Sequence, residues 1–209
     1  MSKINAIAFL GLIVIVSLLC VQCSRDDHRQ PEKAAIKLPK SDVDLQEEGV
    51  YSTVLNDVYV REGANRLVIE DDTTLHTLTP EEIRNAMAVL KRGTWNDLDP
   101  RVVEDLLGKN SGASKLTGRL NSKVDVLMLS KEELAAIGVS EDFWKEFFAR
   151  YPDQSIITLS RVGFSDDRRS ALVVTGEQCG GRCGKGMYVY LTREGDHWTI
   201  KHKIWAWAS

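Results

Sequence analysis

The sequence is poor in the residues and charge patterns on which many enzymes and nucleic-acid-binding proteins depend. Its 209 residues include only four histidines and four cysteines, and the formal net charge is -3. Binding to nucleic acid normally requires a basic face, so a nucleic-acid partner is not expected. The chain also lacks a nucleophile elbow, the paired histidines of a zinc-binding helix, an EF-hand loop and a kinase signature. These absences favour a protein without enzymatic activity and without a cofactor.

The most informative hydrophobic run lies at the N-terminus. Lys3 precedes the uncharged apolar segment AIAFLGLIVIVSLLCV, which spans Ala6–Val21. As a helix rising about 1.5 Å per residue, this segment would be roughly 24 Å long, which is shorter than the ~30 Å hydrocarbon core of a bilayer. The pattern therefore predicts a signal peptide over residues 1–22. The alternative is an uncleaved signal anchor that also includes Ile4 and Asn5.

The junction after this run resembles the cleavage site of bacterial lipoproteins. In LLCVQCSRDD, Cys23 occupies the place of the cysteine that is acylated and becomes the first mature residue. The match departs from the usual pattern at Gln22, where a small residue is common, and at Cys20, where leucine is common. The resemblance implies that Cys23 carries the lipid, and stable anchoring needs more than one acyl chain. We therefore expect an exported protein anchored in the bacterial cell envelope, in the periplasm or, as Ser24 suggests, at the outer membrane.

The segment that follows the anchor is typical of a linker. Ser24–Lys40 is polar, contains two prolines and shows no apolar periodicity. This composition predicts a flexible tether over residues 23–40. A single globular domain is then expected over residues 41–209, a length that is sufficient for one hydrophobic core.

Helical patterns dominate the first part of the globular domain. Apolar residues at helical intervals predict an amphipathic helix over residues 42–60. Thr79, followed by proline, two glutamates and a basic C-terminal end, predicts a second helix. Ser130 and Glu133 form the capping box of a third helix. The segments NRLVIEDDT and KVDVLMLS predict two short strands in the same part of the chain.

From Ser155 onward the period of the hydrophobic residues changes to two. Four strand-like runs follow one another, namely SIITLSRVGF, RSALVVTGEQC, GMYVYLTRE and HWTIKHKIWAWA. Their connections are too short to contain crossover helices, which favours antiparallel pairing. We therefore expect an α+β fold in which the N-terminal helical part packs on the open side of a C-terminal four-stranded antiparallel meander.

The glycine-rich segment GEQCGGRCGKG contains Cys179 and Cys183. A P-loop would need a glycine five positions before its Gly-Lys pair, where this chain has Cys179, and would be followed by a helix. A zinc site would need two further ligands, and the candidates His197 and His202 point to opposite faces of one predicted strand. In an exported protein we favour a disulfide between Cys179 and Cys183 that staples the turn.

An acidic group near the first strand gives the alternative function. Glu70, Asp71, Asp72 and His76 lie close together in the sequence. Glu70, Asp72 and His76 could bind a metal or act as acid and base in a hydrolase. The same residues are also typical of a solvated turn after a strand, and we favour that interpretation.

The last predicted strand is rich in tryptophan. Strand alternation places Trp205 and Trp207 on one face, opposite Ile200 and Ile204. One of these pairs can then be exposed to solvent. An exposed tryptophan pair is a candidate contact surface for a protein or small-molecule partner.

The C-terminal third resembles a group of bacterial exported proteins. The resemblance rests on the helix that ends RYPDQS and on the segments IITLSRVGFSDD, ALVV, CGGRCGKGMYVYLTREGDHWTI and WAWAS. Many members are lipoproteins that end in a Ser-Arg-Val-Gly-Phe strand, a glycine loop and a tryptophan-rich strand. The likeness covers mainly residues 144–209 and implies no activity and no catalytic residue. It is consistent with an envelope protein that is a binding or structural module.

Overall fold

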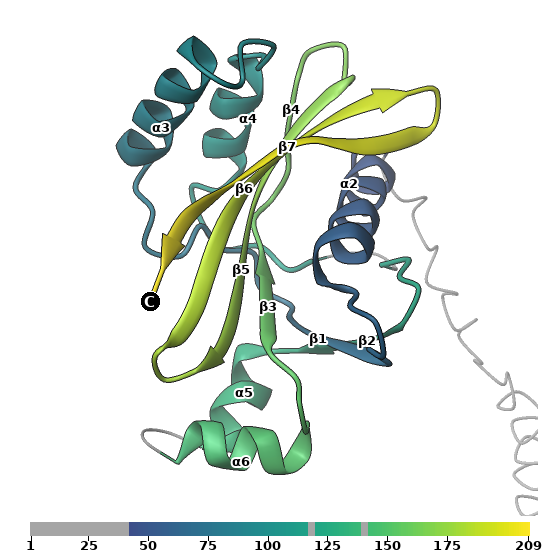
Figure 1. Cartoon of the computed structure of the whole chain (residues 1–209), viewed down its shortest axis with the longest axis vertical. Coiled ribbons are helices and arrows are strands. Elements are labelled where there is room, and N and C mark those ends of the chain that lie inside the picture. Colours follow the sequence, from purple (N-terminus) through teal and green to yellow (C-terminus); the bar gives the residue numbers. More distant parts are fainter. Residues whose placement is uncertain (1–41, 117–119, 139–141) are drawn as a thin grey trace, which may run out of the picture. The chain divides into compact units, whose positions relative to one another are not determined.

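The computed structural model describes residues 42–116, 120–138 and 142–209. The predicted signal peptide, Cys23 and the predicted tether lie outside these residues. No helix in the described part is long and apolar enough to cross a membrane. The helices are α2 (Asp42–Val54) with its π-helical continuation η1 (Leu55–Tyr59), α3 (Pro80–Arg92), α4 (Arg101–Lys109), α5 (Lys131–Ile137) and α6 (Phe143–Arg150). The strands are β1 (Arg66–Glu70), β2 (Asp125–Leu129), β3 (Ile156–Leu159), β4 (Gly163–Phe164), β5 (Ser170–Gly180), β6 (Cys183–Glu194) and β7 (His197–Ala208) (Figure 1).

The helix ends follow the signals in the sequence. In α3, Thr79 Oγ1 accepts a hydrogen bond from the backbone of Glu82, whose carboxylate accepts one from the Thr79 backbone. Ser130 and Glu133 form the same reciprocal cap at α5. The cap predictions are therefore confirmed, because capping depends on residues within one turn of the chain.

The prediction of a four-stranded antiparallel meander is wrong. The strands form one seven-stranded mixed sheet in the order β2-β1-β3-β5-β6-β7, and β4 pairs with β5. β1 runs parallel to both β2 and β3, with Ile69 opposite Ile157, whereas β3, β5, β6 and β7 pair antiparallel. The two strands expected among the helices thus extend the C-terminal sheet. Val68 and Ile69 point to opposite faces and are both fully buried, so β1 needs neighbours and cover on both sides.

Helices cover both faces of the sheet, not one open side as expected. On one face α2 and η1 pack Val54 and Leu55 against Val173 of β5. On the other face α3 and α4 pack Ile83 and Leu106 against residues of β5 and β6, including Leu172, Val174, Tyr188 and Tyr190. Figure 1 shows α2 on one side of these strands and α3 with α4 on the other. This arrangement follows from β5 and β6, which carry apolar side chains at successive positions and therefore on both faces.

The run SIITLSRVGF forms two strands instead of one. At the break over residues 160–162, Ser160 N donates to Val174 O (2.8 Å), and Ser160 Oγ accepts from Val174 N (2.9 Å). β4 then begins at Gly163, where a Cβ atom would overlap Val102 O in α4. The glycine thus lets the α4 backbone pack directly on β4.

Candidate functional site

The disulfide between Cys179 and Cys183 is confirmed. It joins the ends of β5 and β6, with the two Cα atoms 5.0 Å apart. Gly180 is the partner of Cys183 in the ladder and has a φ of 151°, a conformation in which glycine is favoured. The disulfide therefore closes the β5–β6 hairpin and lies next to the C-terminal end of β7, where Gly184 and Ser209 exchange backbone hydrogen bonds.

Trp205 and Trp207 lie on opposite faces of the sheet, contrary to the expectation from strand alternation. Trp205 pairs with Met187 and Trp207 pairs with Gly186, so Ala206 is an additional residue in β7. Such a bulge reverses the alternation of side chains at one point in the strand. Trp205 is 58% exposed, whereas Trp207 is partly buried.

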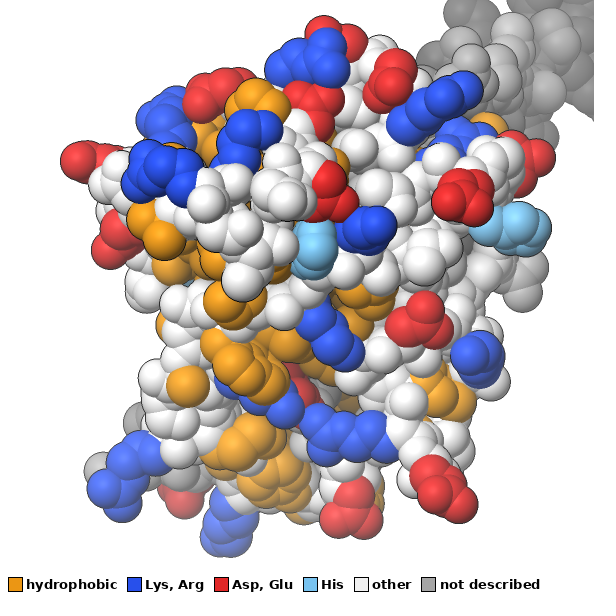
Figure 2. Space-filling model, turned by 45° about the horizontal axis from the view of Figure 1, so that its top comes forward, with side chains coloured by type: hydrophobic (Ala, Val, Ile, Leu, Met, Phe, Trp, Pro, Cys, Tyr) orange, Lys and Arg blue, Asp and Glu red, His pale blue; other side chains and the backbone are white. Residues whose placement is uncertain are grey.

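A chain of charged and polar contacts links Trp205 in β7 to Glu177 near the end of β5. Lys185 Nζ lies 5.5 Å from the Trp205 ring centroid and 2.9 Å from Glu177 Oε2. Arg61 Nη2 donates to both oxygens of Glu177 (3.0 and 3.1 Å), and Ser155 Oγ donates to Oε1 (2.9 Å). We call Trp205, Lys185, Glu177, Arg61 and Ser155 the Trp205–Glu177 surface. Figure 2 shows hydrophobic and basic side chains side by side across the middle of the face that it views.

Glu177 is the anionic centre of this surface. Its side chain is only 6% exposed. Burial by itself raises the pKa of Glu177, but the hydrogen bonds from Lys185 and Ser155 and the charges of Lys185 and Arg61 outweigh this effect and leave the pKa below its usual value. The carboxylate is therefore held ionised and in one orientation, an arrangement that suits recognition of a ligand and not proton transfer near neutral pH.

A cleft of about 810 Å³ adjoins the surface and includes Glu177. Its wall is mainly polar and contains Arg61, Arg66, Asp125, Arg150, Ser155 and Glu177. The inner wall includes Tyr59, whose hydroxyl shares a 2.8 Å hydrogen bond with Thr175 Oγ1 and whose pKa is raised by burial. The cleft can thus contact polar and charged groups of a ligand, and Lys185, which binds Glu177 in its wall, links it to the ring of Trp205 outside the cleft.

On the opposite face of the sheet, His76 of the predicted acidic cluster lies next to Trp207 of the predicted tryptophan pair. His76 and Trp207 meet with ring centroids 5.2 Å apart, close to Gly176 and Gly186. His76 Nε2 is hydrogen-bonded to Thr158 Oγ1, and burial lowers the His76 pKa. Trp207 Nε1 is buried and has no hydrogen-bond partner among the described residues. His76 is thus part of the packing beneath Trp207.

The acidic residues near β1 form an ion-pair cluster with two lysines. Lys115 Nζ lies 2.6 Å from Asp71 Oδ1 and 3.2 Å from Asp72 Oδ1, and Lys131 Nζ lies 3.3 Å from Asp72 Oδ2. Glu70 is 4.0 Å from Lys131, and burial raises its pKa. In the described part of the chain, no three acidic, histidine or cysteine side chains are placed to share a metal ion. Asp72 thus binds both lysines, whereas His76 lies against Trp207 and Thr158.

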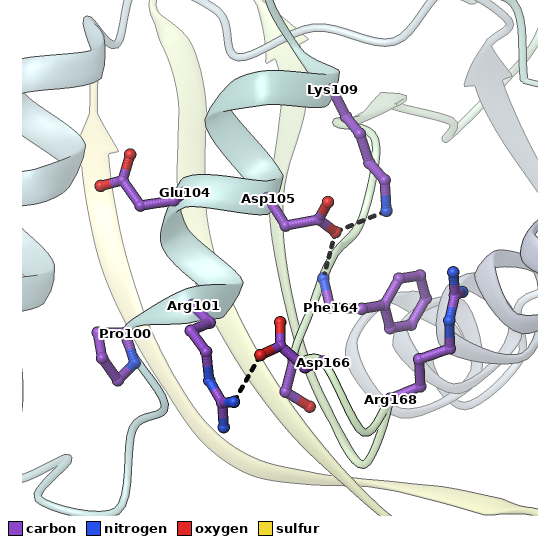
Figure 3. Close-up of a pocket in the computed structure, with 9 residues that line it drawn as sticks. Pro100, Arg101, Glu104, Asp105, Lys109, Phe164, Asp166 and Arg168 are labelled. Carbon is purple, nitrogen blue, oxygen red and sulfur yellow. Dashed lines mark hydrogen bonds and ion pairs between the residues drawn. The ribbon is translucent and has the colours of Figure 1, made fainter.

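A second hollow, of about 620 Å³, lies between α4 and the turn that joins β4 to β5 (Figure 3). Four of its charged side chains form two ion pairs: Arg101 pairs with Asp166 at 2.7 Å, and Asp105 pairs with Lys109 at 2.6 Å. Lys109 and Arg168 lie against the Phe164 ring, at 4.8 and 5.6 Å from its centroid. The Arg101–Asp166 pair and the hydrogen bond that Phe164 N donates to Asp105 Oδ2 (2.7 Å) hold β4 and its turn to α4, so we assign this hollow a structural role.

The chain matches no protein-family model, no curated protein and no solved structure. The functional interpretation therefore rests on the geometry of the Trp205–Glu177 surface.

The sequence interpretation identified Trp205 but missed the rest of this surface. Glu177 and Lys185 are cross-strand partners on either side of the cysteine turn. An acidic and a basic residue at equal distances on either side of a predicted hairpin turn predict a cross-strand ion pair, and this signal could have identified the contact. Arg61 and Ser155 come from other segments, and their sequence neighbours contain no sign of this contact.

Proposed function

We propose that the protein is a lipid-anchored, exported module of the bacterial cell envelope that binds a protein or small-molecule partner without catalysing a reaction. Cys23 carries the lipid in this proposal, and the Trp205–Glu177 surface with its cleft is the binding site. The observation that carries the proposal is the contact of Lys185 with both Trp205 and Glu177, which joins an exposed aromatic ring to a preorganised polar cleft.

Physical properties of the surface support binding. A tryptophan that is 58% exposed can lose a large apolar area from water when a partner covers it, and tryptophan is enriched among residues that dominate binding energy. Lys185 and Arg61 are already oriented by Glu177, so less side-chain entropy is lost when a ligand arrives. These features require no catalytic group.

Photocrosslinking in intact cells tests the binding site. A photoreactive benzoylphenylalanine at Trp205 should give a discrete crosslinked product. The same residue at Val89, which is 61% exposed on α3, is the matched control and should give none. The product should decrease when Arg61→Ala opens the cleft wall. Equal products from both positions, or no effect of Arg61→Ala, would exclude this surface as a specific site.

Mass spectrometry of the protein from native membranes tests the proposed lipid anchor and membrane localisation. We expect an acylated Cys23 at the mature N-terminus, and loss of membrane association in Cys23→Ser. An intact N-terminus starting at Met1 would instead support the signal-anchor alternative and contradict lipidation.

A further inference from the structure

β7 is an edge strand of the sheet, and its regular stretch over residues 202–205, between register shifts at Lys201 and Ala206, is the part that can accept a partner strand. β7 spans His197–Ala208 and pairs with β6, and no described strand lies on its other side. α2 covers its beginning, where Thr53 Oγ1 lies 3.5 Å from Trp198 O. Edge strands present unpaired backbone N–H and C=O groups that can pair with another chain.

The uncovered part of β7 is apolar and basic. Ile204 and Trp205 are 39% and 58% exposed. Lys203 is exposed and forms no ion pair with any described residue. The nearest carboxylate to Lys201 is Asp97 at 3.9 Å, and this carboxylate already binds His202 Nε2 at 2.7 Å. Positive charge therefore exceeds negative charge along this part of the edge.

The edge of β7 is poorly suited to pair with β7 of a second copy of the chain. If two β7 strands paired antiparallel about Lys203, the two Lys203 side chains would lie directly opposite each other, and such like-charge pairs are destabilising. Exposed lysines are also a common means by which edge strands avoid pairing with themselves. An acidic strand would instead place carboxylates opposite Lys203.

We infer that β7 binds an extended peptide segment of a partner protein, with acidic side chains at alternate positions, as a further antiparallel strand of the sheet. Lys203 and Trp205 lie on one face, because their partners Val189 and Met187 are two residues apart in β6. An acidic residue of the peptide can therefore pair with Lys203, while the next acidic residue, two positions away on the same face, lies beside Trp205 and Lys185. This inference names the partner class and rests on the proposed binding function, but it concerns the edge of β7 and not the cleft.

The test uses full-length protein in detergent and a fluorescein-labelled ten-residue peptide of alternating glutamate and valine. Fluorescence anisotropy should detect binding of this peptide, weaker binding of the lysine–valine analogue and none of the fully backbone N-methylated peptide. Lys203→Glu should weaken binding about fivefold, whereas the same charge change in Lys145→Glu, at an exposed site on α6, should leave it unchanged. Hydrogen exchange of the β7 amides should slow when the peptide binds.

Three results would overturn the inference. They are no binding of the glutamate–valine peptide, equal binding of the N-methylated or lysine–valine peptide, or dimers of the protein itself with β7 amides protected. One of these results for β7 could occur together with a crosslink at Trp205 that still depends on Arg61. In that case the cleft remains the binding site, and only the inferred partner class is wrong.

Discussion

Trp207 meets His76 edge-on, with ring centroids 5.2 Å apart, although the two residues come from distant parts of the chain. Both rings approach the sheet where Gly176 and Gly186 are directly opposite each other in β5 and β6. A Cβ atom on Gly186 would overlap Trp207 Nε1, and one on Gly176 would overlap His76 Nε2. The paired glycines therefore create the space in which the end of β7 is held.

Replacing Gly186 should displace Trp207. We expect Gly186→Ala to lower the free energy of unfolding by about 1–3 kcal/mol, because the added methyl group forces the ring or the strand to move. Urea denaturation measures this change. Gly108→Ala is the matched control, since a Cβ there contacts nothing within 4 Å, and alanine in helix α4 should stabilise the protein by up to ~1 kcal/mol. Equal stability of Gly186→Ala and wild type would show that Trp207 is not confined.

Stability should fall in mild acid because of His76. Burial lowers its pKa below the usual value of about 6.5, so the unfolded chain binds a proton more readily than the folded protein. The resulting contribution to stability is present above pH ~6.5 and is lost as the pH falls through the folded-state pKa. Comparison of urea midpoints at pH 7.5 and 5 should show a smaller acid loss in His76→Gln than in wild type. The exposed His197→Gln is the control and should retain the full loss; an unchanged loss in His76→Gln would contradict the assignment.

Glu177 should matter more for stability than either of its cationic partners. Glu177→Ala removes the acceptor that Arg61, Lys185 and Ser155 share. We expect the free energy of unfolding to fall by about 2 kcal/mol. The loss is no larger because Arg61 and Lys185 can still turn toward water. Arg61→Ala should cost less than about 1 kcal/mol, because this side chain is 64% exposed. Thermal unfolding of both variants checks the order. A larger effect of Arg61→Ala would mean that Glu177 is not the centre of the network.

The disulfide should contribute to stability through the unfolded chain. Closing the five-residue ring from Cys179 to Cys183 restricts that chain by about 2 kcal/mol in the chain-entropy model. The double variant Cys179→Ser with Cys183→Ser should therefore unfold at lower urea concentration, and dithiothreitol should shift wild type toward the variant. If dithiothreitol shifts the urea midpoints of wild type and the double variant equally, the disulfide is not the source of the stabilisation.

Local sequence signals predicted the elements better than their arrangement. The helix caps at Thr79 and Ser130, and the disulfide of the hairpin, involve residues only a few positions apart. Strand propensity likewise identified β1 and β2 as strands. It did not reveal that β1 pairs in parallel with β3, because that pairing depends on long-range burial of Val68 and Ile69 on both faces.

The sequence by itself determined the capped starts of α3 and α5, that the cysteines can staple a turn, and that Trp205 is a candidate contact residue. Only the tertiary structure decided that Trp205 and Trp207 face apart, because a single added residue at Ala206 reverses alternation without a local signature. The tertiary structure also assembled Arg61, Ser155 and Lys185 around Glu177. Arg61 follows η1, Ser155 precedes β3 and Lys185 lies in β6, and only the packing of these separate segments brings their side chains within hydrogen-bonding distance of Glu177.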